Sequence, residues 1–216
     1  LDCTFRDGGY YTNWSFDKSL VSETVDILNK SGVDYIELGY KSPVKGGRFR
    51  KCNDSYIKNI IDLNINAKLA FMIDLKDFIT DTKINTKLLN QFIGKKKNSP
   101  FSMCRIAMSE PITLQSVKAS KIIKDLGYET TINFMRCGIV EDKKLDLALE
   151  TLTDDSIDIL YIADSFGSLE VWNIMDLITK FRTTGLKLGI HCHDNMGLAF
   201  SNVLVAIHEG VEYIDA

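Results

Sequence analysis

The sequence predicts an α/β fold in which parallel strands alternate with helices, and it favours a (β/α)8 barrel of the TIM type. Short apolar runs recur along the whole 216-residue chain, with helix-patterned stretches between them. These runs are nearly continuous in apolar residues, as in LAFMI at 69–73, which is typical of parallel strands covered by helices. Their number also matters, because eight strand–helix repeats suit a closed barrel better than an open sheet.

Each apolar run is expected to form one strand. The expected strands span residues 1–6, 33–39, 68–73, 101–107, 129–135, 157–163, 187–193 and 211–216. Helical spacing is clearest at 19–32, 114–127 and 169–185, and each of these segments ends at a glycine. The last run reaches the final residue. We therefore expect a single catalytic domain over residues 1–216 that lacks its eighth helix and forms most of a longer natural protein.

Charge and composition exclude several classes of protein. The formal net charge is −3, whereas a surface that binds nucleic-acid phosphates normally shows a strong basic excess. No apolar run approaches the roughly 20 residues that span a membrane. The five cysteines show no C-x-x-C spacing, which is typical of reduced thiols in a cytoplasmic protein. We expect a cytoplasmic protein with a small-molecule substrate and with neither a nucleic-acid nor a membrane partner.

Polar side chains gather where the predicted strands end. Catalytic groups of such barrels lie at the carboxyl ends of the strands, so these residues are expected at one mouth of the barrel. They are Arg6, Asp7, Glu37, Asp74, Arg105, Asn133, Arg136, Asp164, Ser165, His191, His193 and Asp194. The candidates for substrate binding among them are Glu37, Arg105, Arg136 and Ser165. Alternatively, the carboxylates of Glu37 and Asp74 orient the groups that bind the ligand, or they are internal partners of Arg105 and Arg136.

Two of the three histidines, His191 and His193, are separated only by Cys192. Alternate residues of a strand point to the same face, so both imidazoles are expected on one side and Cys192 on the other. Two imidazoles on one strand can bind one cation, and Asp7 is the best candidate for a carboxylate that completes the site. The alternative is that the two rings only form hydrogen bonds with neighbouring side chains.

Four segments resemble the motifs of one enzyme superfamily. They are LDCTFRDGGYYTNWSF at the first predicted strand, IELGY at the second, IADSFGSL at the sixth and GIHCHDNMGLA at the seventh. Together they resemble the DRE-TIM metallolyases, the HMG-CoA lyase-like (HMGL-like) superfamily. Its members include 4-hydroxy-2-oxovalerate aldolase, HMG-CoA lyase, isopropylmalate synthase and the carboxyltransferase domain of pyruvate carboxylase. The DSFG segment favours the branch of 4-hydroxy-2-oxovalerate aldolase.

The resemblance implies a divalent metal ion, Mn, Mg, Co or Zn, held by Asp7, His191 and His193. It also implies that a 2-oxo acid of the pyruvate type binds this metal, which polarises the carbonyl and stabilises an enolate, so that a carbon–carbon bond is cleaved or formed. Arg6 would stand beside the same oxygen as a second positive charge. Tyr10 occupies the position where aldolases of this type carry a histidine for proton transfer, and it is the second candidate catalytic residue.

Several alternatives remain open from the sequence. The motifs are compatible with a Claisen-type acyl-CoA lyase or synthase of the same superfamily. A metal-independent aldolase would need a Schiff-base lysine, for which only Lys41 is suitably placed. A sugar-phosphate-binding barrel would use the loop at 194–199. A non-catalytic barrel fragment would expose apolar surface and would associate, as a homo-oligomer or with a further segment.

Overall fold

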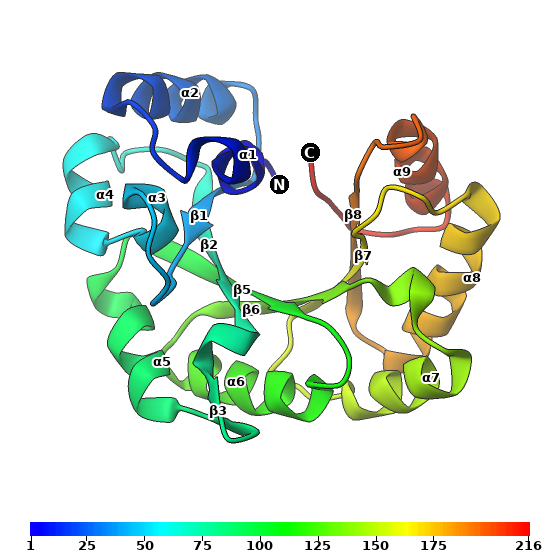
Figure 1. The fold of residues 1–216 in the computed structure, drawn as a ribbon. Helices are drawn as coiled ribbons and strands as arrows, with labels where there is room; N and C mark the ends of the chain where they lie inside the picture. Colours follow the sequence, from blue (N-terminus) through cyan, green and yellow to red (C-terminus); the bar gives the residue numbers. More distant parts are fainter. The chain divides into compact units, whose positions relative to one another are not determined.

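The computed structural model describes residues 1–216 and shows an α/β fold. The strands are β1 (Tyr35–Tyr40), β2 (Lys68–Asp74), β3 (Ile79–Thr80), β4 (Lys83–Ile84), β5 (Phe101–Met108), β6 (Glu129–Met135), β7 (Ile159–Asp164), β8 (Lys187–Cys192) and β9 (Tyr213–Ile214). Seven of them form one sheet in the order β1-β2-β5-β6-β7-β8-β9, and β3 pairs with β4 separately (Figure 1). The pairs β1–β2, β6–β7, β7–β8 and β8–β9 are parallel.

Helices connect the strands. The α-helices are α1 (Thr4–Thr12), α2 (Lys18–Lys30), α3 (Arg48–Lys51), α4 (Asp54–Ile60), α5 (Thr86–Ile93), α6 (Thr113–Asp125), α7 (Asp142–Thr151), α8 (Val171–Phe181) and α9 (Ala199–His208). Short 3-10 helices are η1 (Leu75–Phe78), η2 (Lys96–Asn98), η3 (Cys137–Ile139) and η4 (Arg182–Thr184). None of these helices combines the length and the apolar character that a membrane span needs.

The chain forms two compact units. Unit 1 contains Leu1–Arg105, Ile122–Glu129 and Ala216, and unit 2 contains Ile106–Lys121 and Thr130–Asp215. Because the boundaries fall inside β5, β6 and α6, each of these elements contributes residues to both units.

Unit 1 is built around β1 and β2. Tyr35 pairs with Lys68 where the two strands begin, and both α1 and α3 pack against β1. Local capping decides where three helices start, because the side chains of Asp17, Asn53 and Asn85 accept hydrogen bonds from first-turn N–H groups of α2, α4 and α5. These caps separate the polar loops from the helix segments that pack on the sheet.

Unit 2 is built around β6, β7, β8 and β9. The register places Ala163 of β7 beside His191 of β8, and Asp164 beside Cys192. Helix α8 packs against β7, and α9 packs against both β8 and α8, so α7, α8 and α9 follow one another along one side of these strands (Figure 1). The carboxyl ends of β7 and β8 therefore lie side by side, and the polar residues that follow them are brought together.

The first predicted strand is wrong beyond its opening residues. Only Asp2 joins the sheet, through a single bridge to Ile36, whereas Thr4–Thr12 forms α1. The reason is local, because the carboxylate of Asp2 accepts hydrogen bonds from the backbone N–H and the hydroxyl of Thr4 and so favours a helical turn. The candidate residues that follow in the chain therefore project from a helix and not from a strand end.

The other predicted strands and the three predicted helices are confirmed, with shifts of a few residues at their ends. The last predicted strand is shorter than expected and is reduced to Tyr213–Ile214. The parallel sheet confirms the α/β class. A closed eight-stranded barrel and the absence of an eighth helix stay predictions.

Candidate active site

His191 and His193 approach each other at the carboxyl end of β8. Their Nε2 atoms lie 3.3 Å apart, and the two rings are nearly perpendicular at 86°. Nδ1 of His193 lies 2.8 Å from the backbone oxygen of Asp164, where the ring must act as the donor. Nδ1 of His191 lies 3.1 Å from Oδ2 of Asp215. The contact of His193 with a carbonyl oxygen requires the proton on Nδ1, which leaves a lone pair on Nε2 of His193.

The two Nε2 atoms fit a divalent cation. The tautomer of His191 decides whether the two Nε2 atoms share a hydrogen bond or face each other with lone pairs, and a neutral imidazole is a common ligand of divalent metals. Two nitrogens about 2.1 Å from one ion lie roughly 3.0 to 3.4 Å apart in octahedral or tetrahedral coordination. The observed separation of 3.3 Å falls in this interval. The same separation is also hydrogen-bond distance, so the metal-ligand role of the pair stays a prediction.

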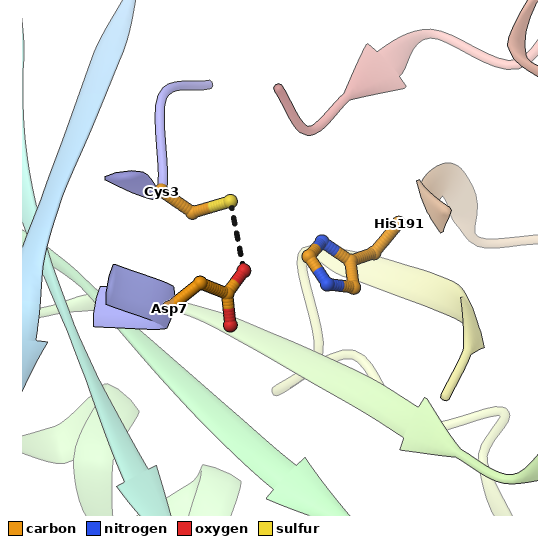
Figure 2. A group of neighbouring side chains, drawn as sticks. All are labelled: Cys3, Asp7 and His191. Carbon is orange, nitrogen blue, oxygen red and sulfur yellow. Dashed lines mark hydrogen bonds between the residues drawn. The ribbon is translucent and has the colours of Figure 1, made fainter. Parts of the chain in front are cut away.

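Asp7 lies in the first turn of α1, where it contacts Cys3 and Arg6. The Cys3 thiol donates a hydrogen bond to Oδ2 at 3.4 Å, which is the dashed line in Figure 2. The guanidinium of Arg6 forms an ion pair with Oδ1 of Asp7. The Asp7 side chain is 32% exposed, so a ligand can reach it. Such a carboxylate suits the harder divalent ions.

A buried carboxylate holds Arg6 in place. Oε2 of Glu37 accepts hydrogen bonds from Nε of Arg6 at 2.8 Å and from Nη1 of Arg105 at 3.0 Å, and all three side chains are buried. Oε1 of Glu37 is buried without a hydrogen-bond partner. Burial opposes the charge of Arg6, but attraction by Glu37 and Asp7 outweighs it and raises the pKa of Arg6 well above its usual value. Arg6 is therefore a permanent cation.

Glu37 and Arg105 thus form a buried ion pair, which is the alternative role that the sequence left open for these two residues. Asp74 does not pair with an arginine, because its carboxylate lies 2.7 Å from Nζ of Lys76. A direct contact of Glu37 or Arg105 with a substrate stays a prediction.

Arg136 and Ser165 lie together in unit 2. Arg136 precedes η3 in a left-handed conformation with φ +58°, and its backbone N–H donates to Oγ of Ser165 at 2.9 Å. Both residues line a cavity of about 510 Å³ that also touches α7 and α8. The Ser165 hydroxyl therefore stabilises the turn after β6, and the exposed Arg136 side chain stays available for a ligand.

Tyr10 lies one helical turn after Arg6 on α1 and is 63% exposed. Its hydroxyl is 3.0 Å from the hydroxyl of Tyr40, the last residue of β1. Its ring packs edge-on against Trp14, with ring centroids 4.8 Å apart. The candidate proton-transfer group is thus exposed to solvent on one side and held by a second tyrosine on the other.

Lys41, the lysine that a Schiff-base mechanism would need, is buried among partners of its own. Its Nζ donates to Oδ1 of Asp54 at 2.7 Å and to the backbone oxygen of Ile93 at 3.0 Å. It also lies over the rings of Phe71 and Phe101, at 4.7 and 5.3 Å from their centroids. These contacts argue for a structural ammonium group and against a Schiff-base lysine.

Sequence reasoning does not identify Asp215 or Tyr40 as site residues. Both stand at the carboxyl end of a strand, β9 and β1 respectively, so the rule that selects polar residues at strand ends could have found them. Tyr40 is easily taken for a core aromatic because its strand is buried throughout. Asp215 falls inside a run expected to be strand.

A parallel α/β sheet with paired metal-ligand candidates at a strand end defines the class of protein: an α/β enzyme domain with its site at the carboxyl ends of the strands. The sequence pattern of the HMGL-like family matches residues 1–216. The chain belongs to the HMGL-like family, as its motifs indicate.

The curated relatives include aldolases. The 4-hydroxy-2-oxovalerate aldolase of Geobacillus genomosp. 3 is 27% identical over 217 residues, which cover 100% of this chain and 63% of that protein. The 4-hydroxy-2-oxovalerate aldolase 2 of Mycobacterium sp. (strain JLS) is 25% identical over 222 residues, which cover 99% of this chain and 60% of that protein. The chain thus spans about three fifths of the length of these relatives.

Solved structures show the same fold. The N-terminal domain of a candidate aldolase from Bacteroides vulgatus is 31% identical with a TM-score of 0.83, and the match covers 100% of this chain and 71% of that one. The HMG-CoA lyase of Bacillus subtilis is 17% identical with a TM-score of 0.73, covering 100% and 74%. At this lower identity the likeness shows the fold alone.

Proposed function

We propose that this domain carries the active site of a divalent-metal-dependent carbon–carbon lyase that acts on a 2-oxo acid, as a 4-hydroxy-2-oxovalerate aldolase does. The observation that carries the proposal is the facing pair of Nε2 atoms of His191 and His193, each on a ring whose Nδ1 has another partner. Membership of the HMGL-like family and the aldolase names of the relatives support the same reaction class.

His191, His193 and Asp7 are the proposed metal ligands. When bound, the metal supplies a Lewis acid that polarises the carbonyl of a 2-oxo acid and favours its enolate. Imidazole nitrogens with a carboxylate oxygen suit Mn, Co, Zn and, less strongly, Mg. Mn²⁺ is the first ion to test because it accepts both kinds of ligand.

Arg6 is proposed to stabilise the negative charge that develops on the enolate oxygen. Its guanidinium cannot lose its proton under ordinary conditions, so it donates hydrogen bonds without acting as an acid. Glu37 holds it through Nε, which leaves other N–H groups for the substrate. A positive group fixed in this way needs little rearrangement when the charge forms.

Tyr10 is proposed as the proton-transfer group. In the cleavage direction its phenolate oxygen takes the proton of the substrate's 4-hydroxyl group. The electron pair of that O–H bond becomes the new carbonyl bond of the aldehyde, and the pair of the broken C3–C4 bond passes into the enolate of the 2-oxo acid. In the synthetic direction the Tyr10 phenol returns the proton to the aldehyde oxygen.

A Claisen-type acyl-CoA lyase is the second candidate, and membership of the HMGL-like family is the observation that favours it. It would use the same enolate chemistry on a thioester. The closed (β/α)8 barrel and a cytoplasmic location belong to the proposal as well. All five cysteines are free, four of them buried, which supports a reducing compartment.

Metal binding and enolate formation test the proposal together. The metal-stripped protein is titrated with MnCl2 in a calorimeter, and we expect one ion per chain. His191→Ala should lose this binding, whereas the control His208→Ala, whose side chain on α9 is 86% exposed, should keep it. Exchange of the methyl protons of pyruvate for deuterium, followed by NMR, should depend on Mn²⁺. Stoichiometric Mn²⁺ without exchange of pyruvate or cleavage of 4-hydroxy-2-oxovalerate or HMG-CoA would refute the proposal.

A further inference from the structure

We propose that Tyr40 is a positioning residue for proton transfer by Tyr10: its hydroxyl donates to the phenolic oxygen of Tyr10 and stabilises that oxygen while it is deprotonated. This inference rests on the proposed function, because it adds a second residue to the role given to Tyr10. The resemblance to aldolases points to the position of Tyr10 alone.

The geometry pairs one exposed tyrosine with one buried tyrosine. The two hydroxyl oxygens lie 3.0 Å apart, which is hydrogen-bond distance. Tyr10 is 63% exposed and Tyr40 only 3%. A substrate can therefore reach the Tyr10 oxygen, whereas Tyr40 can act on a substrate only through Tyr10.

Either hydroxyl can donate while both tyrosines are neutral, but burial makes Tyr40 the donor once Tyr10 is deprotonated. Burial raises the pKa of Tyr40 well above its usual value, an effect that the nearby Arg6 only partly offsets. Tyr40 thus stays a neutral phenol with one proton to donate. When Tyr10 gives up its own proton, Tyr40 remains the donor, and a hydrogen bond to a phenolate is stronger than one to a neutral oxygen.

The Trp14 ring packs against both tyrosine rings, and the Arg50 guanidinium packs against the Tyr40 ring. The Trp14 ring packs edge-on against Tyr10 and Tyr40, with centroids 4.8 and 5.6 Å away. The guanidinium of Arg50 lies 4.4 Å from the Trp14 ring centroid and 4.5 Å from that of Tyr40, and it also lies 3.8 Å from the carboxylate of Asp77. The Tyr40 ring therefore has little freedom to turn its hydroxyl away.

Trp14 itself is held in an uncommon conformation. Its φ is +53°, in the left-handed region that bulky residues rarely adopt. Backbone and side chain are both tied to α1, since its N–H donates to the oxygen of Gly9 at 3.0 Å and its indole Nε1 donates to the oxygen of Arg6 at 3.1 Å. A strained residue that is secured by so many contacts is a sign of a functional position. Here the conformation of Trp14 places its indole ring against Tyr10 and Tyr40.

The test is a double-mutant cycle on cleavage of 4-hydroxy-2-oxovalerate by the Mn²⁺-loaded protein. Tyr40→Phe removes one hydroxyl and keeps the ring that packs on Trp14 and Arg50. We expect kcat to fall between about tenfold and a hundredfold, the range for a hydrogen bond to a charged group, with KM little changed. Tyr10→Phe should lower kcat further, and adding Tyr40→Phe to it should change nothing more.

Tyr35→Phe is the matched control. Tyr35 lies on the same strand, and its hydroxyl is 2.9 Å from both oxygens of Glu129, so this variant also loses a hydroxyl with hydrogen bonds. It should keep full kcat. Thermal unfolding and Mn²⁺ titration of each variant verify that fold and metal site are intact.

The outcomes separate the two proposals. An unchanged kcat in Tyr40→Phe would overturn the inference. The inference would also fail if Tyr40→Phe lowered kcat by the same factor in the wild type and in Tyr10→Phe, because such a result would indicate a structural role. An inactive wild-type protein that binds Mn²⁺ would refute the proposed function itself. Loss of activity in Tyr10→Phe but not in Tyr40→Phe would leave the proposed function standing and reject the role of Tyr40.

Discussion

Asp215→Asn is expected to weaken the binding of Mn²⁺ by about tenfold, although the side chain is not a proposed ligand. Oδ2 of Asp215 lies 3.1 Å from Nδ1 of His191, and the Asp215 side chain is fully buried. The amide keeps the size of the side chain and an oxygen that can accept, but it loses the charge. Hydrogen bonds to charged groups are worth about 1 to 1.5 kcal/mol more than neutral ones, which corresponds to about one decade in Kd. Carboxylates that orient metal-binding histidines show effects of about 10- to 100-fold.

Isothermal titration of the metal-stripped variant with MnCl2 measures this effect directly. Asp158→Asn is the matched control, because Asp158 precedes β7 and its carboxylate accepts a hydrogen bond from the backbone N–H of Thr130 at 2.8 Å. That variant should lose some stability and keep its Kd for Mn²⁺. The reasoning would be refuted by an Asp215→Asn protein that binds Mn²⁺ as tightly as the wild type while His191→Ala does not bind it.

Three further predictions concern stability and reactivity. In Gly9→Ala the new Cβ would lie 2.1 Å from the Trp14 indole, so the free energy of unfolding in urea should fall by about 1–3 kcal/mol. In Gly8→Ala the nearest atom is 4.0 Å away, and the free energy of unfolding should rise by up to about 1 kcal/mol. Equal effects at both sites would contradict the packing argument. Lys41→Met removes the cation beside Asp54, whose carboxylate then keeps the Ser99 hydroxyl as a donor, and should lower the free energy of unfolding by about 3 kcal/mol in the same assay. Borohydride with pyruvate should label neither the wild type nor this variant. Burial raises the pKa of Cys137 to about 12. This thiol should therefore stay protonated at mildly alkaline pH and react with a thiol reagent only after unfolding. Rapid labelling of Cys137 in the native protein would disprove this prediction.

The features that follow from local periodicity were predictable from the sequence. The parallel strands appear as apolar runs because both of their faces are covered, and the pairing of His191 with His193 follows from the two-residue period of a strand. The first strand was not predictable in this way. A single hydrogen-bonding side chain, Asp2, starts a helix where the apolar pattern indicates a strand.

The two residues of the candidate site that the sequence did not identify, Asp215 and Tyr40, are brought to it by tertiary contacts. Asp215 reaches His191 only because β9 pairs with β8 in one particular register. Tyr10 meets Tyr40 only because α1 packs against β1. No spacing along the chain encodes either contact, so a sequence pattern alone leaves both partners unidentified.

One oxygen of Glu37 contacts two buried guanidinium groups, and Asp7 supplies the second negative charge beside Arg6. Replacing any one of Arg6, Glu37 and Arg105 leaves a buried charge unbalanced, which costs several kcal/mol, a large part of the stability of a domain. Tyr10 stands at the exposed rim, where a different side chain hardly affects folding. A substitution of the exposed Tyr10 therefore leaves the charge balance of Arg6, Glu37 and Arg105 unchanged.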